Sequence, residues 1–344
     1  MRLKVERLCK GVLPHVFVDG SLLATRGNEL LRSTDLGASW CTVAQVYDRG
    51  DKRAVSSRLR PIDRFLHHSP FLVVPHDSGL LAFCRDGLRH LMVGASHFVP
   101  LASPIDFRPM RRGVCATSSG AVLVGEYRHN GGEARVQPRD PVHIHRWDGQ
   151  DWDVAWTFPE DTVRHVHAIV EHPRRPGEVY VCTGDTDAES VIWRTTDGFE
   201  TLTPWISEGQ VSRACDLQFV DNDVLWGIDS PLKPSAICRF DGEVARLTET
   251  PGPVYFGGHN AAGEIWFGTS VEAGPSVKTD RVHVFASVDG GRTFHDCFQR
   301  TADKLPQLSV VHIPSGTVPD DHVVVYLRAT WRWEGCMVVG RLCR

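Results

Sequence analysis

Short runs of apolar and β-branched residues recur along the whole chain, and turn-forming residues separate them. Stretches such as "VIWRT", "AICRF" and "HVFAS" read as strands, because they are short, apolar and followed within two residues by an aspartate. We find no convincing amphipathic pattern with the helical period of 3.6 residues between them. The pattern therefore predicts an all-β fold built from many short strands.

One short motif repeats along the chain: a hydroxyl residue, an aspartate, a glycine, a second hydroxyl and an aromatic at fixed offsets. Two stretches match it fully, "RSTDLGASW" and "SVDGGRTFHD", and a third, "RTTDGFETL", has Phe199 where the glycine belongs. Two looser copies keep the aspartate and a glycine, at Asp148 and Asp241. From Asp148 onward the aspartates lie at positions 148, 197, 241 and 289, so they are 49, 44 and 48 residues apart. That spacing is the length of one four-stranded propeller blade.

The offsets within the motif have a physical reason. Asp and Gly make a tight turn in which Gly supplies the positive φ, and the acid and hydroxyls bond to the backbone of the turn. The aromatic side chain then packs under the neighbouring strand. These residues resemble the Asp-box, or BNR, repeat of sialidase-like β-propellers. The resemblance implies a propeller in which each motif is the turn between the third and fourth strands of a blade, but it implies no particular activity.

The repeats divide the chain into blades. Three further strands follow the last motif, in "LSVVHIP", "HVVVYLRA" and "CMVVGRL". The N-terminal stretch "RLKVERL" can supply the fourth strand of that last blade and remove its free edge. We therefore predict one domain over residues 1–344, a seven-bladed β-propeller; six blades is the alternative, because Asp86-Gly87 falls one hairpin early in the second blade. The six preceding blades span residues 15–43, 71–94, 111–158, 164–205, 213–247 and 253–298.

Charge, hydropathy and cysteine content narrow the class of protein. The formal net charge is −4 and no long basic run occurs, which argues against nucleic-acid partners. No stretch of about 18 or more apolar residues occurs, so we expect no membrane segment. The N-terminal "MRLKVERLCKGVLPHVF" lacks the features of a signal peptide, and the ten cysteines include no CxxC pair. We therefore expect free thiols and a cytoplasmic protein.

The predicted turns separate two faces of the propeller. In each blade the innermost strand starts, and the second strand ends, on the face opposite the Asp-containing turns. The loops after the second strand are long and polar in four consecutive blades, as in "GEYRHNGGEARVQPRDP", and such loops commonly carry binding groups. The ionisable side chains that we expect on this face are Glu126, Tyr127, Arg164, His165, His167, Asp185, Asp187, Arg213, Asp229 and Glu272.

His165 and His167 lie on one face of a predicted strand, beside Glu126 of the preceding blade and Asp185 of their own. Histidine and carboxylate side chains are suitable ligands for a divalent metal, so these four residues could hold one. They could instead form a proton-transfer set without metal, in which a histidine or Tyr127 acts as the base. A third interpretation is structural: the histidines hydrogen-bond within the core between blades.

The acidic and basic residues on this face suggest a reaction on an acidic sugar. Glu126, Asp185 and Asp229 are the acid and base candidates, because hydrolysis of a glycosidic bond commonly uses two carboxylates. Arg164 and Arg213 are suited to gripping a carboxylate or sulfate. Each residue also has a structural interpretation, because acids after a strand cap turns and arginines form ion pairs between blades. The further substrate-binding candidates are Asp187 and Glu272.

The family resemblance limits the function. Sialidases carry an Arg-Ile-Pro motif, an arginine triad and a Tyr/Glu nucleophile pair, and "LRPID" and "FRPMR" do not match that motif. Other proteins with this architecture include glycosidases and seven-bladed polysaccharide lyases, some of which use His, Tyr and Arg at the propeller centre. The stretches "GEYRHN" and "TGDTDAES" also resemble a group of bacterial BNR-repeat proteins described as hydrolase-like.

These observations point to an enzyme, although they leave that open. We expect a carbohydrate-active enzyme, either a glycoside hydrolase or a polysaccharide lyase, that acts on an acidic glycan or glycoconjugate at the central pocket. One alternative is a non-catalytic propeller that binds a glycan or a protein. The other is a metal-dependent enzyme acting on a non-sugar small molecule.

Overall fold

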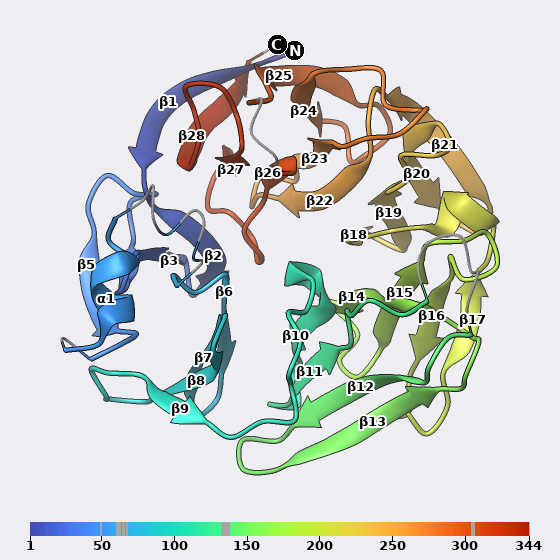
Figure 1. The fold of residues 1–344 in the computed structure, drawn as a ribbon. Helices are drawn as coiled ribbons and strands as arrows, with labels where there is room; N and C mark the ends of the chain where they lie inside the picture. The colour runs from blue at the N-terminus through green and yellow to red at the C-terminus, as the bar shows by residue number, and fades with distance from the viewer. Residues whose placement is uncertain are drawn as a thin grey trace.

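Strands make up most of the chain, which confirms the predicted all-β class. The computed structural model describes residues 1–48, 50–59, 63, 66, 68–131, 138–303 and 307–343. Helical structure is short, as in α1 (Lys52–Ser56), which Asp51 caps by accepting the backbone N–H of Arg53 at 2.8 Å. The sheets stand around a common central axis (Figure 1). Among the described residues, no helix has the length and apolar character needed to cross a bilayer.

Five sheets have four antiparallel strands each, in chain order from the axis outward. The first two contain β2 (Leu13–Val18), β3 (Ser21–Arg26), β4 (Glu29–Ser33) and β5 (Cys41–Gln45), and β6 (Leu72–His76), β7 (Gly79–Cys84), β8 (Gly87–Met92) and β9 (Val99–Leu101). The third contains β10 (Val114–Ala116), β11 (Val122–Gly125), β12 (Val142–Trp147) and β13 (Trp152–Phe158), preceded by the 3₁₀ turn Arg111–Gly113. The last two contain β14 (His165–Glu171), β15 (Val179–Gly184), β16 (Ile192–Thr195) and β17 (Thr203–Ile206), and β18 (Gln218–Val220), β19 (Asp223–Gly227), β20 (Ser235–Phe240) and β21 (Val244–Thr250).

The sixth sheet has eight strands and joins the two ends of the chain. One half contains β22 (Val254–His259), β23 (Ile265–Val271), β24 (Arg281–Ser287) and β25 (His295–Thr301). The other half contains β26 (Ser309–His312), β27 (His322–Arg328), β28 (Cys336–Cys343) and the N-terminal strand β1 (Arg2–Lys10). The halves are linked where β23 pairs with β26.

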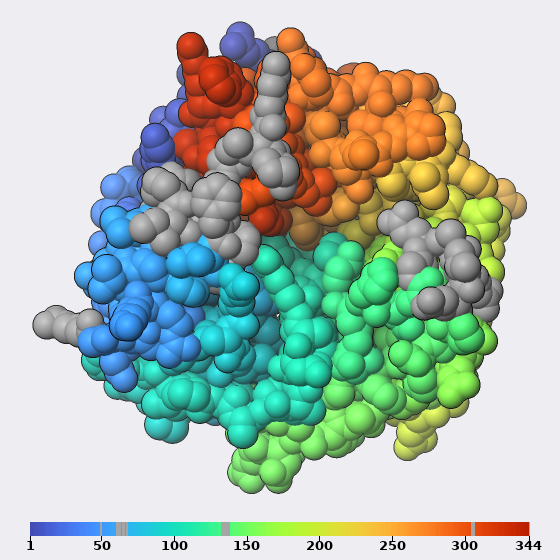
Figure 2. Space-filling view, viewed as in Figure 1, coloured from blue at the N-terminus to red at the C-terminus, as the bar shows by residue number. Residues whose placement is uncertain are grey.

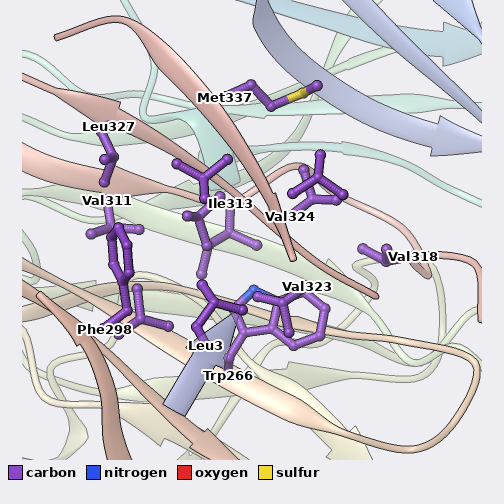
Figure 3. Close-up of a cluster of buried hydrophobic side chains, with 14 of the residues drawn as sticks. Leu3, Trp266, Phe298, Val311, Ile313, Val318, Val323, Val324, Leu327 and Met337 are labelled. Carbon is purple, nitrogen blue, oxygen red and sulfur yellow. The ribbon is translucent and has the colours of Figure 1, made fainter. Parts of the chain in front are cut away.

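The N-terminal strand β1 is part of this core. It pairs antiparallel with β28, so that Arg2 lies opposite Cys343. Leu3 of β1 packs in the same buried cluster as Trp266 of β23 and Met337 of β28 (Figure 3). Burial of about 1.5–3 kcal/mol per large apolar side chain makes this cluster a strong tie between the two chain ends.

The Asp-containing motifs form turns between the third and fourth strands of their sheets. In the turn between β24 and β25, Asp289 Oδ1 accepts the hydroxyl of Ser287 at 2.7 Å and the backbone N–H of Thr293 at 3.0 Å. Its Oδ2 accepts the Thr293 hydroxyl at 2.6 Å. Asp35 and Asp197 make the same bonds in the turns that follow β4 and β16. The acid is therefore a turn former on the face opposite the long polar loops.

The third copy of the motif shows why glycine is preferred at its fifth position. Gly291 has a φ of 77°, and Phe199 adopts a φ of 75° at the equivalent place. A bulky residue in this left-handed region is strained. Phe199 is nevertheless buried in the core cluster with Val181, so side-chain packing offsets the backbone strain.

Asp289→Ala is expected to lower the free energy of unfolding by about 1–3 kcal/mol, because two backbone N–H groups and two hydroxyls lose their acceptor. Chemical denaturation measures the change. Asp241→Ala is the matched control, because in the described chain the Asp241 carboxylate only approaches Arg239, at 4.0 Å. Ligand binding and activity should be unaffected; their loss at an unchanged melting temperature would show that Asp289 is more than a turn former.

Candidate functional site

A buried group of ionisable side chains lies where β14 starts and β15 ends. His165 lies opposite Gly184 in the register of these strands, and a bulge falls at His167. The Nε2 atoms of His165 and His167 are 3.0 Å apart. Each of them is 3.3 Å from an oxygen of Asp185, the residue that follows β15. Bulges commonly re-aim side chains at functional sites, and here both imidazoles face the same carboxylate.

Two arginines neutralise Asp185. Arg164, directly before β14, forms an ion pair with Asp185 Oδ2, and Arg213 Nη2 lies 2.9 Å from Oδ1. Burial by itself raises the pKa of Asp185, but the hydrogen bonds from His165 and His167 outweigh it and hold the pKa well below its ordinary value. Burial lowers the pKa of His167 to about 4. At neutral pH Asp185 is therefore a carboxylate and His167 a neutral imidazole.

Asp229 extends this group toward the next sheet. Its backbone N–H donates to the carbonyl of Arg213 at 2.9 Å, which places its side chain beside the arginine. Asp229 Oδ2 accepts the thiol of Cys215 at 3.1 Å and lies 3.9 Å from His167 Nδ1. Burial raises the pKa of Asp229 to about 7. We call His165, His167, Asp185, Asp229, Arg164 and Arg213 the histidine–aspartate group.

The remaining sequence-predicted residues lie at different distances from this group. The ring of Tyr127 stacks on that of His165, with centroids 4.1 Å apart. Glu272 accepts the hydroxyl of Ser270 at 2.9 Å. Burial is the main cause of the raised pKa of Asp229; the charge of Arg213 opposes it, and the charge of Glu272 adds to it.

Glu126 and Asp187 are not brought into side-chain contact with His165 or His167; the imidazole that Glu126 contacts is that of His145, at 3.2 Å. Glu126 accepts the backbone N–H of His143 at 3.0 Å and a side-chain bond from Arg128 at 2.8 Å. It therefore points toward β12 and away from Asp185. Asp187 is largely exposed and lies 3.1 Å from Lys233 Nζ.

A pocket of about 1390 Å³ lies at the centre of the same face. Light blue, teal and red segments supply most of its lining, and they meet around the centre of the face in Figure 2. Tyr127 and Tyr255 also line it. Asp185 and Asp229 are only 5% and 3% exposed. Tyr127 is part of the pocket wall, and the histidine–aspartate group lies behind it, away from the pocket.

The pocket lining contains five arginines, Arg85, Arg108, Arg111, Arg328 and Arg332. Three of them come from distant parts of the chain and are electrostatically linked, because, in addition to burial, the charge of Arg328 lowers the pKa of both Arg108 and Arg111. We call Arg108, Arg111 and Arg328 the arginine set. The Arg108 guanidinium lies 4.4 Å from the ring centre of Phe71, and Arg111 donates to the carbonyls of Phe71 and Pro14 at 2.6 and 2.9 Å. Within the described part of the chain, none of the three forms an ion pair with a carboxylate.

The arginine set is electrostatically strained. Burial, and then the charge of Arg328, lowers the pKa of Arg108 to about 10. Burial, and then neighbouring arginines, lowers the pKa of Arg111 to about 9. Both groups remain cations at neutral pH, so their mutual repulsion persists. An anion in the pocket would relieve it, because charge-assisted bonds from arginine to carboxylate, sulfate or phosphate are strong.

His312 and Tyr326 lie beside the arginine set. Their ring centres are 6.1 Å apart, and both line the pocket. Burial, and then the charge of Arg111, lowers the pKa of His312 well below its ordinary value, so its imidazole is neutral. Its Nδ1 is buried without a hydrogen-bond partner in the described chain. A neutral imidazole and a phenol beside an anion site can transfer protons.

Sequence reasoning did not select His312, Tyr326, Arg108 or Arg328. The signal was present: Arg328 ends the second strand of its half-sheet, the same position that pointed to Tyr127 elsewhere. Arg108 belongs to "FRPMR", which was compared only with the sialidase motif, whereas Arg111 was expected at the start of an innermost strand on this face.

Comparisons with known proteins support the fold. No protein-family model matches the chain, and no curated protein matches it. An ancestral GH74 enzyme is similar in structure, with a TM-score of 0.54 and 10% identity over 96% of this chain and 45% of that one. A chain of the mitotic checkpoint complex has a TM-score of 0.57 and 12% identity, covering 100% of this chain and 94% of its own length.

The prediction of a cytoplasmic location is wrong according to the comparison with solved structures. The extracellular domain of a protein described as a hybrid two-component system of B. thetaiotaomicron matches with a TM-score of 0.55 and 11% identity. This chain is covered completely and spans 40% of that protein's chain. Extracellular neighbours point away from the cytoplasm, so we withdraw that prediction. At these identities the likeness establishes the fold alone, a β-propeller.

Proposed function

We propose that the chain is a β-propeller enzyme that binds an acidic glycan in the central pocket and cleaves it by β-elimination. The observation that carries this proposal is the arginine set: its three members line one pocket and repel one another, and no described carboxylate pairs with them. Burying like charges together is costly unless a ligand supplies the opposite charge. The aromatic rings of Phe71, Phe107, Tyr127, Tyr255 and Phe256 line the same pocket and suit the faces of sugar rings.

The pocket carboxylates favour elimination over hydrolysis. Hydrolysis needs two carboxyl groups that are free to flank the glycosidic bond. The four described acids of the lining each accept a bond from the protein: Asp63 from Ser69, Asp86 from Tyr47, Asp106 from Arg128 and Glu334 from Ala329. Asp185 and Asp229 are buried beneath the wall. Elimination instead needs an anion clamp, a base and an acid.

Each step of the elimination can be assigned to a residue beside the arginine set. The arginine set binds the carboxylate of a uronic acid and stabilises the negative charge that develops when the C5 proton leaves. His312 takes that proton, the C4–O bond breaks, and a C4–C5 double bond forms. Tyr326 donates a proton to the leaving oxygen. The ligand's carboxylate offsets the arginine charges, which raises the pKa of His312 and makes it a better base.

The sequence-predicted residues have a supporting part in this proposal. Tyr127 is the member of that set whose ring lines the pocket, and we assign it to sugar contact and proton transfer. His165, His167, Asp185, Asp229, Arg164 and Arg213 hold it from below. Glu126 and Asp187 do not line the pocket, so we assign them to contacts with the parts of the glycan that extend over the surrounding loops.

His312→Gln is expected to lower turnover of a polyuronate by about 10²–10⁴-fold, the range for removing a general base. Ultraviolet absorbance of the unsaturated uronate product measures turnover, across a panel of uronate-containing glycans. The control is His295→Gln, an exposed histidine at the start of β25. New reducing ends without ultraviolet absorbance would instead show hydrolysis and overturn the elimination.

A non-catalytic glycan-binding propeller is the second candidate. The observation that favours it is the burial of the histidine–aspartate group, which keeps its acids from a ligand. This candidate predicts that wild-type protein binds a polyuronate through the arginine set and releases no product.

We further propose that the ring has seven blades and belongs to the Asp-box propellers. Dividing the eight-stranded sheet at the contact between β23 and β26 leaves seven four-stranded units. The pairing of β1 with β28 would then close the ring. The shared hydrogen bonds of Asp35, Asp197 and Asp289 support the repeat.

A further inference from the structure

We infer that His167, Cys215 and Asp229 form a binding site for a divalent transition metal, most suitably zinc, beneath the pocket wall. The site goes beyond the proposed glycan chemistry and does not depend on it. It also differs from the metal set expected from the sequence, because Glu126 lies elsewhere and Cys215 was not considered. His167 comes from β14, Cys215 precedes β18 and Asp229 follows β19, so the metal would join two sheets.

The donor atoms are close enough to share one ion. The ligand atoms of the three residues all lie within 4.8 Å of one another. Cys215 Sγ is 3.1 Å from Asp229 Oδ2, and His167 Nδ1 is 3.9 Å from the same oxygen. In a tetrahedral zinc site, bonds of about 2.0–2.3 Å place neighbouring donors roughly 3.3–3.6 Å apart. The observed separations bracket that value, so small side-chain shifts complete the geometry.

Two buried atoms of this trio lack a partner. Within the described chain, His167 Nδ1 and Asp229 Oδ1 make no hydrogen bond, although both residues are at least nine-tenths buried. Buried polar atoms are nearly always satisfied, so each exception calls for an explanation. A metal bound to His167 Nδ1 and to both oxygens of the Asp229 carboxylate would satisfy these two atoms together.

The environment of His167 fixes which nitrogen is available. Its Nε2 lies 3.3 Å from Asp185 Oδ1, so the ring proton belongs on Nε2, where it is donated to the ionised carboxylate. The lone pair of Nδ1 then lies 3.9 Å from Asp229 Oδ2, and when Asp229 is ionised this arrangement repels unless a cation lies between the two atoms. A carboxylate behind a ligating histidine is a recurrent feature of zinc sites. Arg164 and Arg213 in turn hold Asp185 in place.

The charge balance also permits a metal. Asp185 and Asp229 as carboxylates offset Arg164 and Arg213, so these four groups sum to zero. When a dication binds, the Cys215 thiol releases its proton to solvent as the sulfur–metal bond forms, which leaves a local charge of +1. A thiolate among the donors selects zinc and similar metals over magnesium and calcium. The alternative trio of His165, His167 and Asp185 is less suitable, because Arg164 and Arg213 both contact its only carboxylate closely, whereas Asp229 has one arginine nearby, Arg213 at 3.6 Å.

The purified chain is expected to bind about one zinc per molecule, measured by elemental analysis after dialysis against a weak chelator. Cobalt substitution supplies a second readout, because a Co²⁺–thiolate bond gives a charge-transfer band in the near ultraviolet. Cys215→Ser should abolish that band and weaken zinc binding at least tenfold, and Asp185→Asn should weaken it about 10–100-fold. Cys238→Ser, at a buried cysteine that is not part of the donor group, should leave both unchanged.

Three outcomes would overturn the site. They are zinc far below one equivalent with no zinc-dependent rise in melting temperature, no cobalt–thiolate band in wild type, or an unchanged band in Cys215→Ser. The cobalt spectrum of wild type tests the site even if a variant does not fold. None of these measurements uses a glycan, so they separate this inference from the proposed reaction.

Discussion

Arg112→Leu is expected to lower the free energy of unfolding by about 3–5 kcal/mol, the cost of leaving a buried charge without its partner. Arg112 Nε lies 2.7 Å from Asp216 Oδ2, and its Nη2 donates to the carbonyls of Gly257 and Ile313 at 3.0 and 3.3 Å. Nη1 also donates to Ser315. One side chain therefore binds together parts of the chain up to 203 residues apart.

The size of this effect comes mainly from Asp216. Its side chain is 5% exposed, and burial raises its pKa, so an unpaired carboxylate there would be strongly unfavourable. Its other close contacts are backbone N–H groups of Gly257 and Leu217. Urea denaturation of the variant measures the loss, and Arg112→Leu with Asp216→Asn should recover part of it. Arg146→Leu, which breaks the exposed pair with Asp153, is the control and should cost less than about 1 kcal/mol. A similar loss in the free energy of unfolding for both variants would show that Arg112 does not hold these distant parts of the chain together.

Arg328→Leu is expected to have opposite effects on stability and binding. In the free protein it removes one of three mutually repelling cations, so the free energy of unfolding should rise by about 1 kcal/mol. Affinity for a polyuronate should fall by at least about 30-fold, since truncating one partner of a buried charge pair costs about 2–5 kcal/mol.

Thermal unfolding and titration calorimetry on the same samples measure both effects. Arg32→Leu is the matched control, since Arg32 is an exposed cation on β4. A fall in stability together with unchanged affinity would mean that Arg328 is structural and that the pocket does not take an anion.

The sequence predicted the all-β fold class and the proximity of His165, His167 and Asp185, and strand geometry is the reason in both cases. The Asp289 turn showed which face of each sheet carries the tight turns. On the opposite face, the start of β14 and the end of β15 then pointed to His165, His167 and Asp185. The same reasoning could not separate Glu126 from Tyr127. Neighbouring residues point to opposite sides of a strand, and only the structure shows which of them reaches the pocket.

The arginine set depends on contacts that sequence spacing does not reveal. Arg108 and Arg328 are 220 residues apart and meet only because the sheets curve around one axis. The burial of Asp185 was also not visible in the sequence. Asp185 reads as an acid in a polar loop, yet two arginines and two histidines surround it, and Tyr127 stacks on one of those histidines. Long-range convergence and side-chain burial are properties of the whole arrangement of sheets and not of any single repeat.

The central claim is that the arginine set recognises the carboxylate of an acidic glycan. Calorimetric titration with an oligouronate and with its carboxyl-reduced, neutral counterpart tests it most directly. The account predicts that wild-type protein binds the acidic form, that it binds the neutral form at least about 30-fold more weakly, and that Arg328→Leu removes this preference. Equal affinity for the two forms, or a preference that survives in Arg328→Leu, would contradict it.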